Sequence, residues 1–391
     1  MSGRYFPIDE YEQRWKRSDE ALRACGLEVA VVWSRSAGTY DRCADLLYLA
    51  NYYGNQPGQG RRGPAGFAAA ILRLGELPEL FADIHDPRPT VIATDRVHAC
   101  ADTFAAVGDV VRAFGSRKVG LVGTDVIPMK YWTGLQAATP QTQWVVVDEL
   151  VRQIRLVKSS RELEAFRLAG ETVSHALSAL MSALVAGQSE AQAAGHAADI
   201  VFRGGGHVHM LAVNHGAGLK YLTSDPVAGF SDERPCRGDL SRAWLTGPMF
   251  QGYWLGPGRT VVCGRRATPE QRALLEANAS AVNAVIGGIR PGVTVRELVD
   301  IGDRHVAQFG SELSELSKQW PLYGHGNGLF FEAPTISTRV GNDAEFRLQE
   351  NMVVSIEMFF QRQGVGEAGF ENSVIVTHSG TELLTCTPML W

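Results

Sequence analysis

The sequence predicts an α+β protein of two domains, the first of which is itself an α/β unit. A chain of 391 residues exceeds the size that one hydrophobic core usually serves, so two domains are expected. Up to about residue 150, short apolar segments such as LEVAVVWS, KVGLVGTD and TQWVVVDE alternate with helical stretches, a pattern typical of an α/β domain. From about residue 320 onward, strand patterns dominate. We therefore expect domains over residues 1–152 and 153–391.

Helical patterns and a set of short strands fill the middle of the chain. Residues 161–186 carry apolar side chains three and four positions apart and stop at Gly187, which predicts a long helix with one buried face. Further helices are expected from Ser189 to the glycines at 204–206, over 268–287 and over 295–309. Turn residues separate apolar pairs over 238–264, which indicates antiparallel strands.

Composition excludes several classes of partner. The chain has 37 basic and 42 acidic residues and no basic run, so nucleic acid is not expected as a partner. Its first 20 residues are too charged for a signal peptide, and no uninterrupted apolar segment reaches about 18 residues, so no membrane association is expected. Six cysteines without a CxxC pair fit reduced thiols. We expect a cytoplasmic protein that acts on a small molecule.

One histidine and two glutamates in separate segments form the candidate site. His325 lies in YGHGNGLFFEAP between two glycines, which allow a close approach to a ligand. Glu357 lies in VVSIEMFF, where strand alternation places it in an apolar run. A buried carboxylate must be paired, protonated, metal-bound or open to a wet cleft, although an edge strand could also expose this glutamate to solvent. Glu371 follows in GFENSVIVT.

These segments resemble the motifs of a known superfamily. IRLVKSSRELEAFRLA is similar to the linker and first helix of the creatinase, prolidase and methionine aminopeptidase superfamily, which has the "pita-bread" fold. GHGNG, NMVVSIEMFF and GFENSVIVTHSGTELLT resemble its later motifs in the same order. The likeness covers essentially the whole chain. It implies a creatinase/prolidase-like N-terminal domain over 1–152 and a pita-bread catalytic domain over 153–391.

The resemblance implies a divergent metal site. Prolidases and aminopeptidases of this superfamily bind two divalent ions through two Asp, one His and two Glu, and the His and both Glu match His325, Glu357 and Glu371. Counted back from Gly252-Tyr253 and from Arg259, the two Asp positions hold Leu245 and Gly256. A shifted alignment would use Asp239 as the first element of an Asp-x-x-Arg motif, but it displaces the other matches. We therefore expect no dinuclear metal centre, the alternative being one divalent cation on the remaining three ligands.

Creatinase is the metal-free precedent that the resemblance offers, but its acid/base set is also incomplete here. Its catalytic His and one catalytic Glu correspond to Ser224 and Gly258. The superfamily's second His, in a His-Glu-x-Pro motif, is replaced by Phe331 before Glu332, which makes the cleft drier and removes a donor.

Several further residues are candidates for substrate binding. Ser224 and Asp225 could orient a substrate, although a plain turn before Pro226 would use the same residues. Tyr253, followed by Trp254, could wall the pocket, although a core role is the default for such aromatics. Phe331 completes this group.

Three histidines in HVHMLAVNH could share one strand face and bind a metal. They are His207, His209 and His215, and no companion carboxylate stands at ligand spacing. Buried or surface histidines without a ligand are the commoner case.

The Arg-rich loop GQGRRGPAG, with Arg61 and Arg62, is too polar to pack in its own domain core. The resemblance implies a homodimer in which this domain of one subunit closes over the site of the other. Either arginine could then bind an anionic group of the substrate, or both could be solvated.

We expect an enzyme that cleaves a C–N bond, of the amide or amidine type, in a small polar substrate. His325 would donate or relay a proton, and Glu357 would accept one or hold a cationic group, with Glu371 as the third catalytic residue. The alternatives are a lyase on the same fold, as in a superfamily relative that cleaves a sulfonium compound, and a non-catalytic peptide-binding pseudo-peptidase.

Overall fold

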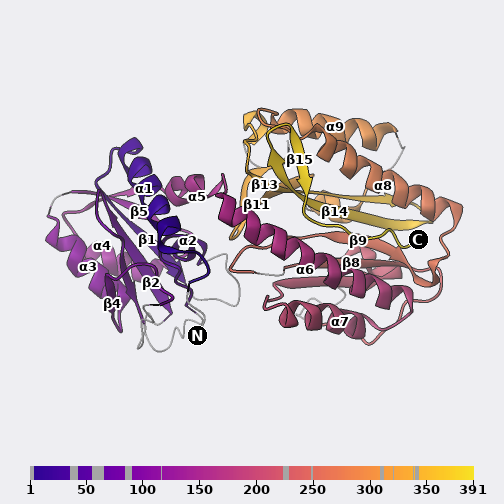
Figure 1. The fold of residues 1–391 in the computed structure, drawn as a ribbon, viewed down its shortest axis with the longest axis horizontal. Coiled ribbons are helices and arrows are strands. Elements are labelled where there is room, and N and C mark those ends of the chain that lie inside the picture. Colours follow the sequence, from indigo (N-terminus) through magenta and orange to yellow (C-terminus); the bar gives the residue numbers. More distant parts are fainter. Residues whose placement is uncertain are drawn as a thin grey trace. The chain divides into compact units, whose positions relative to one another are not determined.

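The computed structural model describes residues 4–35, 43–54, 66–83, 90–115, 117–222, 229–247, 250–308, 312–319, 321–337, 339 and 343–391. The chain forms two compact units, Met1–Arg155 and Leu156–Trp391, and each combines helices with a sheet (Figure 1). This confirms the predicted α+β class with an α/β first domain.

The first unit is built on a mixed sheet with the strand order β4-β3-β2-β1-β5-β6. Its strands are β1 (Val29–Arg35), β2 (Phe67–Arg73), β3 (Glu79–Ala82), β4 (Val97–Ala99), β5 (Lys118–Val122) and β6 (Gln143–Val146). Its helices are α1 (Ile8–Ala24), α2 (Ala44–Ala50), α3 (Thr103–Ala113), α4 (Met129–Ala138) and α5 (Glu149–Arg155). An aromatic core closes one face, where Phe104 stacks on Trp33 with ring centroids 4.2 Å apart.

The second unit contains, within the described residues, a nine-stranded sheet with the path β12-β11-β13-β14-β9-β8-β7, from which β10 and β15 branch. Its strands are β7 (Met210–His215), β8 (Leu240–Thr246), β9 (Gly258–Val262), β10 (Glu312–Leu313), β11 (Gly324–Asn327), β12 (Phe331–Thr335), β13 (Val353–Arg362), β14 (Gly366–Thr377) and β15 (Gly380–Leu383). Its helices are α6 (Ser160–Val185), α7 (Glu190–Arg203), α8 (Pro269–Gly288), α9 (Val295–Gln308) and α10 (Glu315–Gln319), with 3₁₀ turns at Gly216–Lys220, Cys263–Arg265 and Asp343–Glu345.

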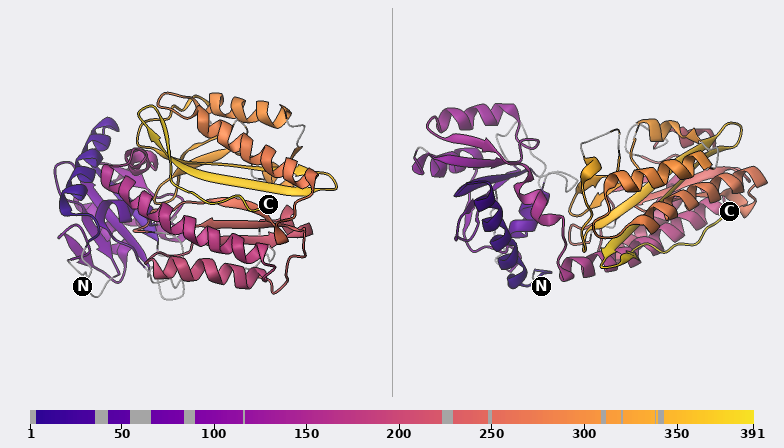
Figure 2. Two further views of the ribbon diagram at one scale, coloured as in Figure 1. Left: turned by 45° about the vertical axis from the view of Figure 1, so that its right-hand side comes forward. Right: turned by 90° about the horizontal axis from the view of Figure 1, so that it is seen from above.

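Local sequence signals set the starts of the long helices in this unit. Ser159, Ser189 and Thr268 each form a capping box, in which the cap side chain and the side chain three positions later satisfy each other's backbone N–H groups. Helix α6 is long and apolar enough to cross a membrane by length and composition, but half of that window is buried in the fold, as in a core helix. It packs on β8 and β9, while α8 packs on β13 and β14 (Figures 1 and 2).

The two faces of β13 have different environments. Val354, Ile356 and Met358 join the hydrophobic core that also contains the buried side chains of α8 and α9. The intervening residues Ser355 and Glu357 therefore point to the opposite face of the sheet. The candidate site is built on that opposite face.

Candidate active site

Sheet pairing brings the two glutamates together. Glu357 on β13 is the direct antiparallel partner of Glu371 on β14. Side chains of directly opposed residues have their Cβ atoms about 5 Å apart, so the two carboxyl groups share one environment. Glu357 is 6% exposed and Glu371 is 2% exposed. Two nearly buried carboxyl groups side by side cannot both carry a charge cheaply.

His325 on β11 completes the cluster. Its Nε2 atom lies 3.7 Å from Oε1 of Glu357 and 3.9 Å from Oε1 of Glu371. Its Nδ1 atom lies 3.1 Å from the carbonyl oxygen of Gly326, which can only accept a hydrogen bond, so Nδ1 carries the proton in the neutral ring. Burial lowers the pKa of His325 to about 4. The imidazole is therefore neutral at pH 7 and presents the Nε2 lone pair to both carboxyl groups.

Glu371 is held by an indole. Trp244 Nε1 donates a hydrogen bond to Oε2 of Glu371 at 2.8 Å, whereas Oε1 of Glu371 is buried without a hydrogen-bond partner among the described residues. Burial, together with the charge of Glu357, raises the pKa of Glu371 well above its ordinary value. The pair therefore tends to hold one proton on the Glu371 side.

A buried polar network lies one row away from the glutamates. Asn327 Nδ2 donates to Ser355 Oγ at 2.8 Å, and Ser355 Oγ shares a hydrogen bond of 2.7 Å with Ser373 Oγ. Ser355 and Ser373 are cross-strand partners, as Glu357 and Glu371 are. The network links the strand of His325 to both glutamate strands and restricts their side chains.

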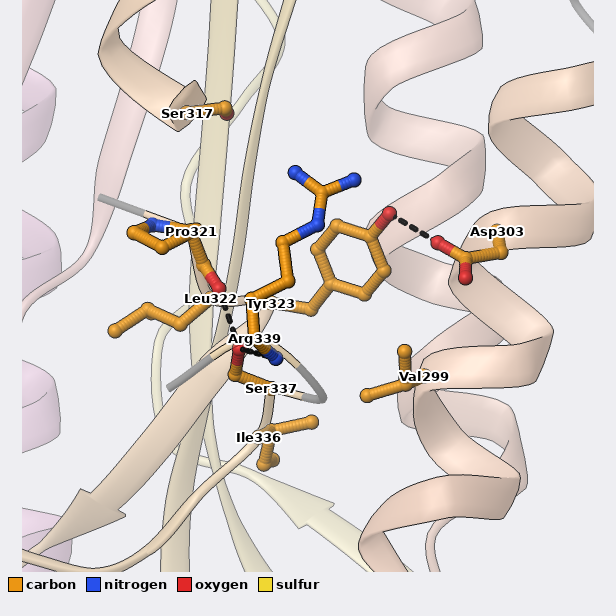
Figure 3. Close-up of a pocket in the computed structure, with 9 residues that line it drawn as sticks. All are labelled: Val299, Asp303, Ser317, Pro321, Leu322, Tyr323, Ile336, Ser337 and Arg339. Carbon is orange, nitrogen blue, oxygen red and sulfur yellow. Dashed lines mark hydrogen bonds between the residues drawn. The ribbon is translucent and has the colours of Figure 1, made fainter. Parts of the chain in front are cut away.

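The strand that carries His325 is anchored at its start by Tyr323, which lines a small pocket (Figure 3). The Tyr323 hydroxyl donates to Asp303 Oδ1 at 2.5 Å, and in the same pocket Ser337 Oγ donates to the carbonyl oxygen of Pro321 at 2.5 Å. Burial and the neighbouring Asp303 raise the pKa of Tyr323. Because these polar groups satisfy one another, we interpret the pocket as a support for the site.

An aromatic wall adjoins His325. Phe331 meets the imidazole edge to face at 4.4 Å between ring centroids, and Trp254 meets Phe331 at 4.8 Å. His209 stacks on Trp254 at 6.1 Å. Phe331 is 38% exposed although its neighbours are mostly buried, so its ring is available to an incoming molecule.

The other candidates from the sequence lie elsewhere or outside the described residues. The Tyr253 hydroxyl donates to Glu162 Oε1 at 2.7 Å and its ring packs on Phe166, so Tyr253 faces helix α6 and Trp254 faces His325. Ser224, Asp225, Arg61 and Arg62 lie outside the described residues.

The three histidines do not share one strand face. Strand β7 begins at Met210, after His207 and His209, and His215 Nδ1 pairs with Glu190 at 2.7 Å. His209 is the member of this set that reaches the aromatic wall.

Comparison with known proteins identifies the family. The sequence profile described as "Metallopeptidase family M24" matches residues 164–378, more than half of the chain. The chain belongs to metallopeptidase family M24. This confirms the resemblance to the creatinase/prolidase superfamily.

Individual M24 relatives support this membership. The "Probable dipeptidase PepE" of Mycobacterium bovis is 32% identical over 97% of this chain and 96% of its own length. The "Xaa-Pro dipeptidase" of Pyrococcus horikoshii is 28% identical over 62% of this chain, and the match spans 66% of that relative, just under two thirds. The crystal structure of "Dipeptidase PepE from Mycobacterium ulcerans" has a TM-score of 0.78 at 23% identity, covering 99% of this chain and 98% of that chain, which shows a shared fold.

The sequence comparison placed Leu245 at the first aspartate position of the superfamily pattern, and the sheet register shows which face of β8 this residue occupies. Trp244, whose indole reaches Glu371, occupies the site face of β8, so its neighbour Leu245 points to the opposite face. A count along the sequence from Gly252 passes through a turn, where one extra residue would reverse the face assigned to each position of β8. The register of the paired strands β8 and β9 gives the face directly. Trp244, rather than Leu245, therefore faces the site from this strand.

Gly256 and Asp239 have different surroundings. A Cβ atom on Gly256 would lie 2.9 Å from Oε1 of Glu371, so position 256 faces the site but offers no ligand. Asp239 accepts a hydrogen bond from the Cys236 N–H at 2.8 Å in a turn before β8, which gives it a local structural role.

The donor set does not fit the two-metal centre of M24 peptidases. On the site face of β8, Trp244 offers an indole that donates a hydrogen bond, and position 256 carries no side chain. Within the described ranges, no group of three or more His, Cys, Asp or Glu side chains is arranged to hold a metal ion. Two cations at close range need bridging carboxylates. The resemblance implies one bridging and one terminal aspartate beside His325, Glu357 and Glu371, and the sequence count finds neither.

Sequence reasoning did not single out Trp244, Asn327 or Ser373 as site residues. Strand alternation alone puts Ser355 on the face of Glu357, and the same rule applied to β14 puts Ser373 beside Glu371. Trp244 could not be found in that way, because only the pairing of β8 with β9, and of β9 with β14, shows its position.

Proposed function

We propose that this M24 protein hydrolyses the amide bond of a small polar substrate, such as a dipeptide, without a dinuclear metal centre. The observation that carries the proposal is the convergence of His325 Nε2 on Oε1 of Glu357 and of Glu371, at 3.7 and 3.9 Å. The relatives named as dipeptidases and Xaa-Pro dipeptidases support the substrate class.

The three side chains supply the proton transfers that amide hydrolysis requires. Glu357 accepts a proton from the attacking water, and Glu371 donates its proton to the leaving amine nitrogen. The Nε2 lone pair of neutral His325 faces both carboxyl groups, so Nε2 can accept the proton from Glu357 and release it to Glu371, which restores the starting state. Trp244 and the Asn327 network keep the groups in place.

The test is turnover of a panel of dipeptides, with and without Pro at the second position, by protein treated with a chelator. We expect metal-free turnover in the wild type and a loss of at least ~100-fold in Glu357→Gln, the usual scale for removal of a general base. Glu350→Gln, at a half-exposed glutamate before β13, is the matched control and should retain full activity. Equal activity of Glu357→Gln and wild type would contradict the proposal. If the chelator removes two equivalents of bound divalent metal and activity is lost with them, the metal-free part of the proposal is contradicted.

A second candidate is a peptide-binding protein without catalysis. The half-exposed Phe331 beside His325 favours it, since an aromatic surface binds apolar groups but transfers no proton. Dipeptide binding measured by calorimetry, with no turnover and equal affinity in wild type and Glu357→Gln, would select this candidate.

A further inference from the structure

Trp244 belongs to one cross-strand row that runs through the site. Glu357 pairs with Glu371, Glu371 pairs with Gly258, and Gly258 pairs with Trp244, on β13, β14, β9 and β8 in that order. Trp244 and Glu371 are thus two strands apart, or about 10 Å between backbones. The indole bridges this distance by lying over Gly258, and its N–H reaches Glu371 at 2.8 Å.

The residues around the indole leave space for it. A Cβ atom on Gly258 would lie 1.9 Å from the indole ring, so no other residue at 258 is compatible with this position of Trp244. A Cβ atom on Gly369 would lie 2.9 Å from the same ring and 2.7 Å from Phe359. Phe359 stacks on Trp244 with ring centroids 4.8 Å apart. Two glycines and one aromatic ring therefore hold the indole in a defined orientation.

The hydrogen bond is directed at a specific atom. Trp244 satisfies Oε2 of Glu371 and leaves Oε1 on the side of His325. An indole has one donor and no acceptor, so it can orient a carboxyl group and cannot bind a cation. A side chain with this chemistry can hold Glu371 in the absence of a metal ion.

We propose that Trp244 is a positioning residue that takes the place of the metal centre: its N–H fixes Glu371 so that Oε1 faces His325, and its ring, lying over Gly258, excludes a cation pair. This proposal rests on the proposed function for its effect on catalysis. Its two structural parts, the hydrogen bond and the exclusion of metal, can be measured without any turnover.

The hydrogen bond is tested by NMR on full-length protein labelled with ¹⁵N at the tryptophan indoles. The Trp244 resonance is assigned by its loss in Trp244→Phe. We expect this resonance to shift in Glu371→Leu, which removes the acceptor. It should shift less in Glu371→Gln, which keeps an acceptor oxygen and is the variant to measure if Glu371→Leu does not fold. The Trp144 indole, which donates to Thr139 Oγ1 at 3.1 Å in the other unit, should not shift. An unchanged Trp244 resonance in a folded Glu371 variant that lacks the acceptor overturns the proposal.

Exclusion of metal is tested by titration with Mn²⁺ alone. Wild type and Trp244→Phe should bind at least tenfold more weakly than Trp244→Asp/Gly256→Asp, which supplies two further carboxylates on the site face. If wild type binds two equivalents of Mn²⁺ as tightly as the double variant, the indole excludes nothing and the proposal is wrong.

Kinetics separate this proposal from the proposed function. Trp244→Phe keeps an aromatic ring and loses only the oriented donor, so it should lower kcat about tenfold with little change in KM. The control Trp144→Phe should change neither kcat nor KM. If no dipeptide is turned over but the NMR and Mn²⁺ results hold, the proposed function fails and the structural role of Trp244 stands. If Glu357→Gln abolishes turnover while Trp244→Phe changes neither kinetics nor the Glu371-dependent resonance, only the role of Trp244 fails.

Discussion

Glu371 and His325 have shifted pKa values of opposite sign, and each sign has a consequence for stability. Burial and the charge of Glu357 raise the pKa of Glu371, whereas burial lowers the pKa of His325 to about 4. For Glu371, the unfolded chain loses its proton first as the pH rises, so the free energy of unfolding falls from about pH 4.5 up to the folded pKa. For His325, the stability is present above about pH 6.5 and is lost as the pH falls toward about 4.

The Glu371→Gln variant should therefore gain stability over wild type as the pH rises. Glutamine binds no proton in either state, so the variant lacks the loss that ionisation causes. We expect the difference in the free energy of unfolding to grow between pH 5 and pH 7 by at most ~1.4 kcal/mol per pH unit. Denaturant unfolding at both pH values measures this difference. His325 makes stability rise with pH in the variant and the wild type alike, so its contribution cancels in the difference. A difference that is constant with pH would contradict the raised pKa.

Gly258→Ala should destabilise the second unit. The added methyl group would overlap the Trp244 ring, and overpacking of this kind costs about 1–3 kcal/mol. Gly195→Ala on the exposed face of α7 is the matched control, because a Cβ atom there meets nothing within 4 Å. The helix propensity of alanine should make that control neutral or more stable by up to ~1 kcal/mol. Equal midpoints of unfolding for the two variants would show that the ring moves aside freely.

At the scale of single residues, the sequence predicted the histidine and the two glutamates of the cluster but not the residues that hold them in place. Glycine neighbours made His325 conspicuous and an apolar run did so for Glu357, while Glu371 was singled out with them by the match to the superfamily's His and two Glu. Trp244 was missed because a tryptophan in an apolar strand looks like ordinary core, and its contact with Glu371 spans two strands.

At the scale of elements, strand β12 depends on a buried ion pair. Lys158, at the start of the second unit, donates from Nζ to Glu332 Oε2 at 2.6 Å and to the carbonyl oxygen of Leu156 at 3.0 Å. Both charged side chains are 2% exposed. The pair fixes β12 beside β11, and with it the position of Phe331 next to His325.

Lys158→Met should remove roughly 3–5 kcal/mol of stability, because it leaves the Glu332 carboxylate without its ammonium partner in a buried site. The control is Arg203→Met, at an exposed helix pair with Asp199, which should leave the midpoint of unfolding nearly unchanged. Chemical denaturation of the two variants and wild type makes the comparison. Similar midpoints for Lys158→Met and Arg203→Met would show that the buried pair contributes no more than a surface pair.

Elements with local signals were predictable and those that depend on distant pairing were not. The long helix expected over 161–186 is found as α6, Ser160–Val185, because its capping box and its terminal glycine are local. Strand β7 was expected to include His207 and His209 but begins at Met210. The start of a strand depends on its partner, here Thr246 of β8, and single-sequence periodicity carries no information about that partner.

At the scale of the whole molecule, we predict a homodimer. The superfamily resemblance implies it, and the polar loop with Arg61 and Arg62 supplies the reason, although that loop lies outside the described residues. Light scattering at micromolar concentration should return about twice the chain mass of 42.5 kDa. A monomer would contradict the prediction.

A separate variant tests the loop. If either arginine binds the substrate, Arg61→Ala/Arg62→Ala should raise KM for a substrate with a free carboxylate, since a bidentate charged contact is lost. Full activity in the double variant would remove the loop from the site and leave the dimer prediction untouched.

The order of the two units and the fold class followed from the sequence, because strand and helix periodicity and the order of motifs are properties of the chain itself. The order of strands within each sheet did not follow. Glu371 has partners on β13 and β9, about 14 and 113 residues away in the chain, and such separations leave no local signal.

The packing of the indole over Gly258 also restricts the sequence of mutations by which this site could change. While Trp244 is present, any side chain at position 258 meets the ring at 1.9 Å, so a carboxylate cannot be introduced there first. Trp244 must become smaller before position 258 can vary, whereas position 256 can vary earlier if the Glu371 carboxyl group moves. The order in which positions 244 and 258 can change is therefore fixed by their contact. A library that varies each position singly would record position 258 as invariant.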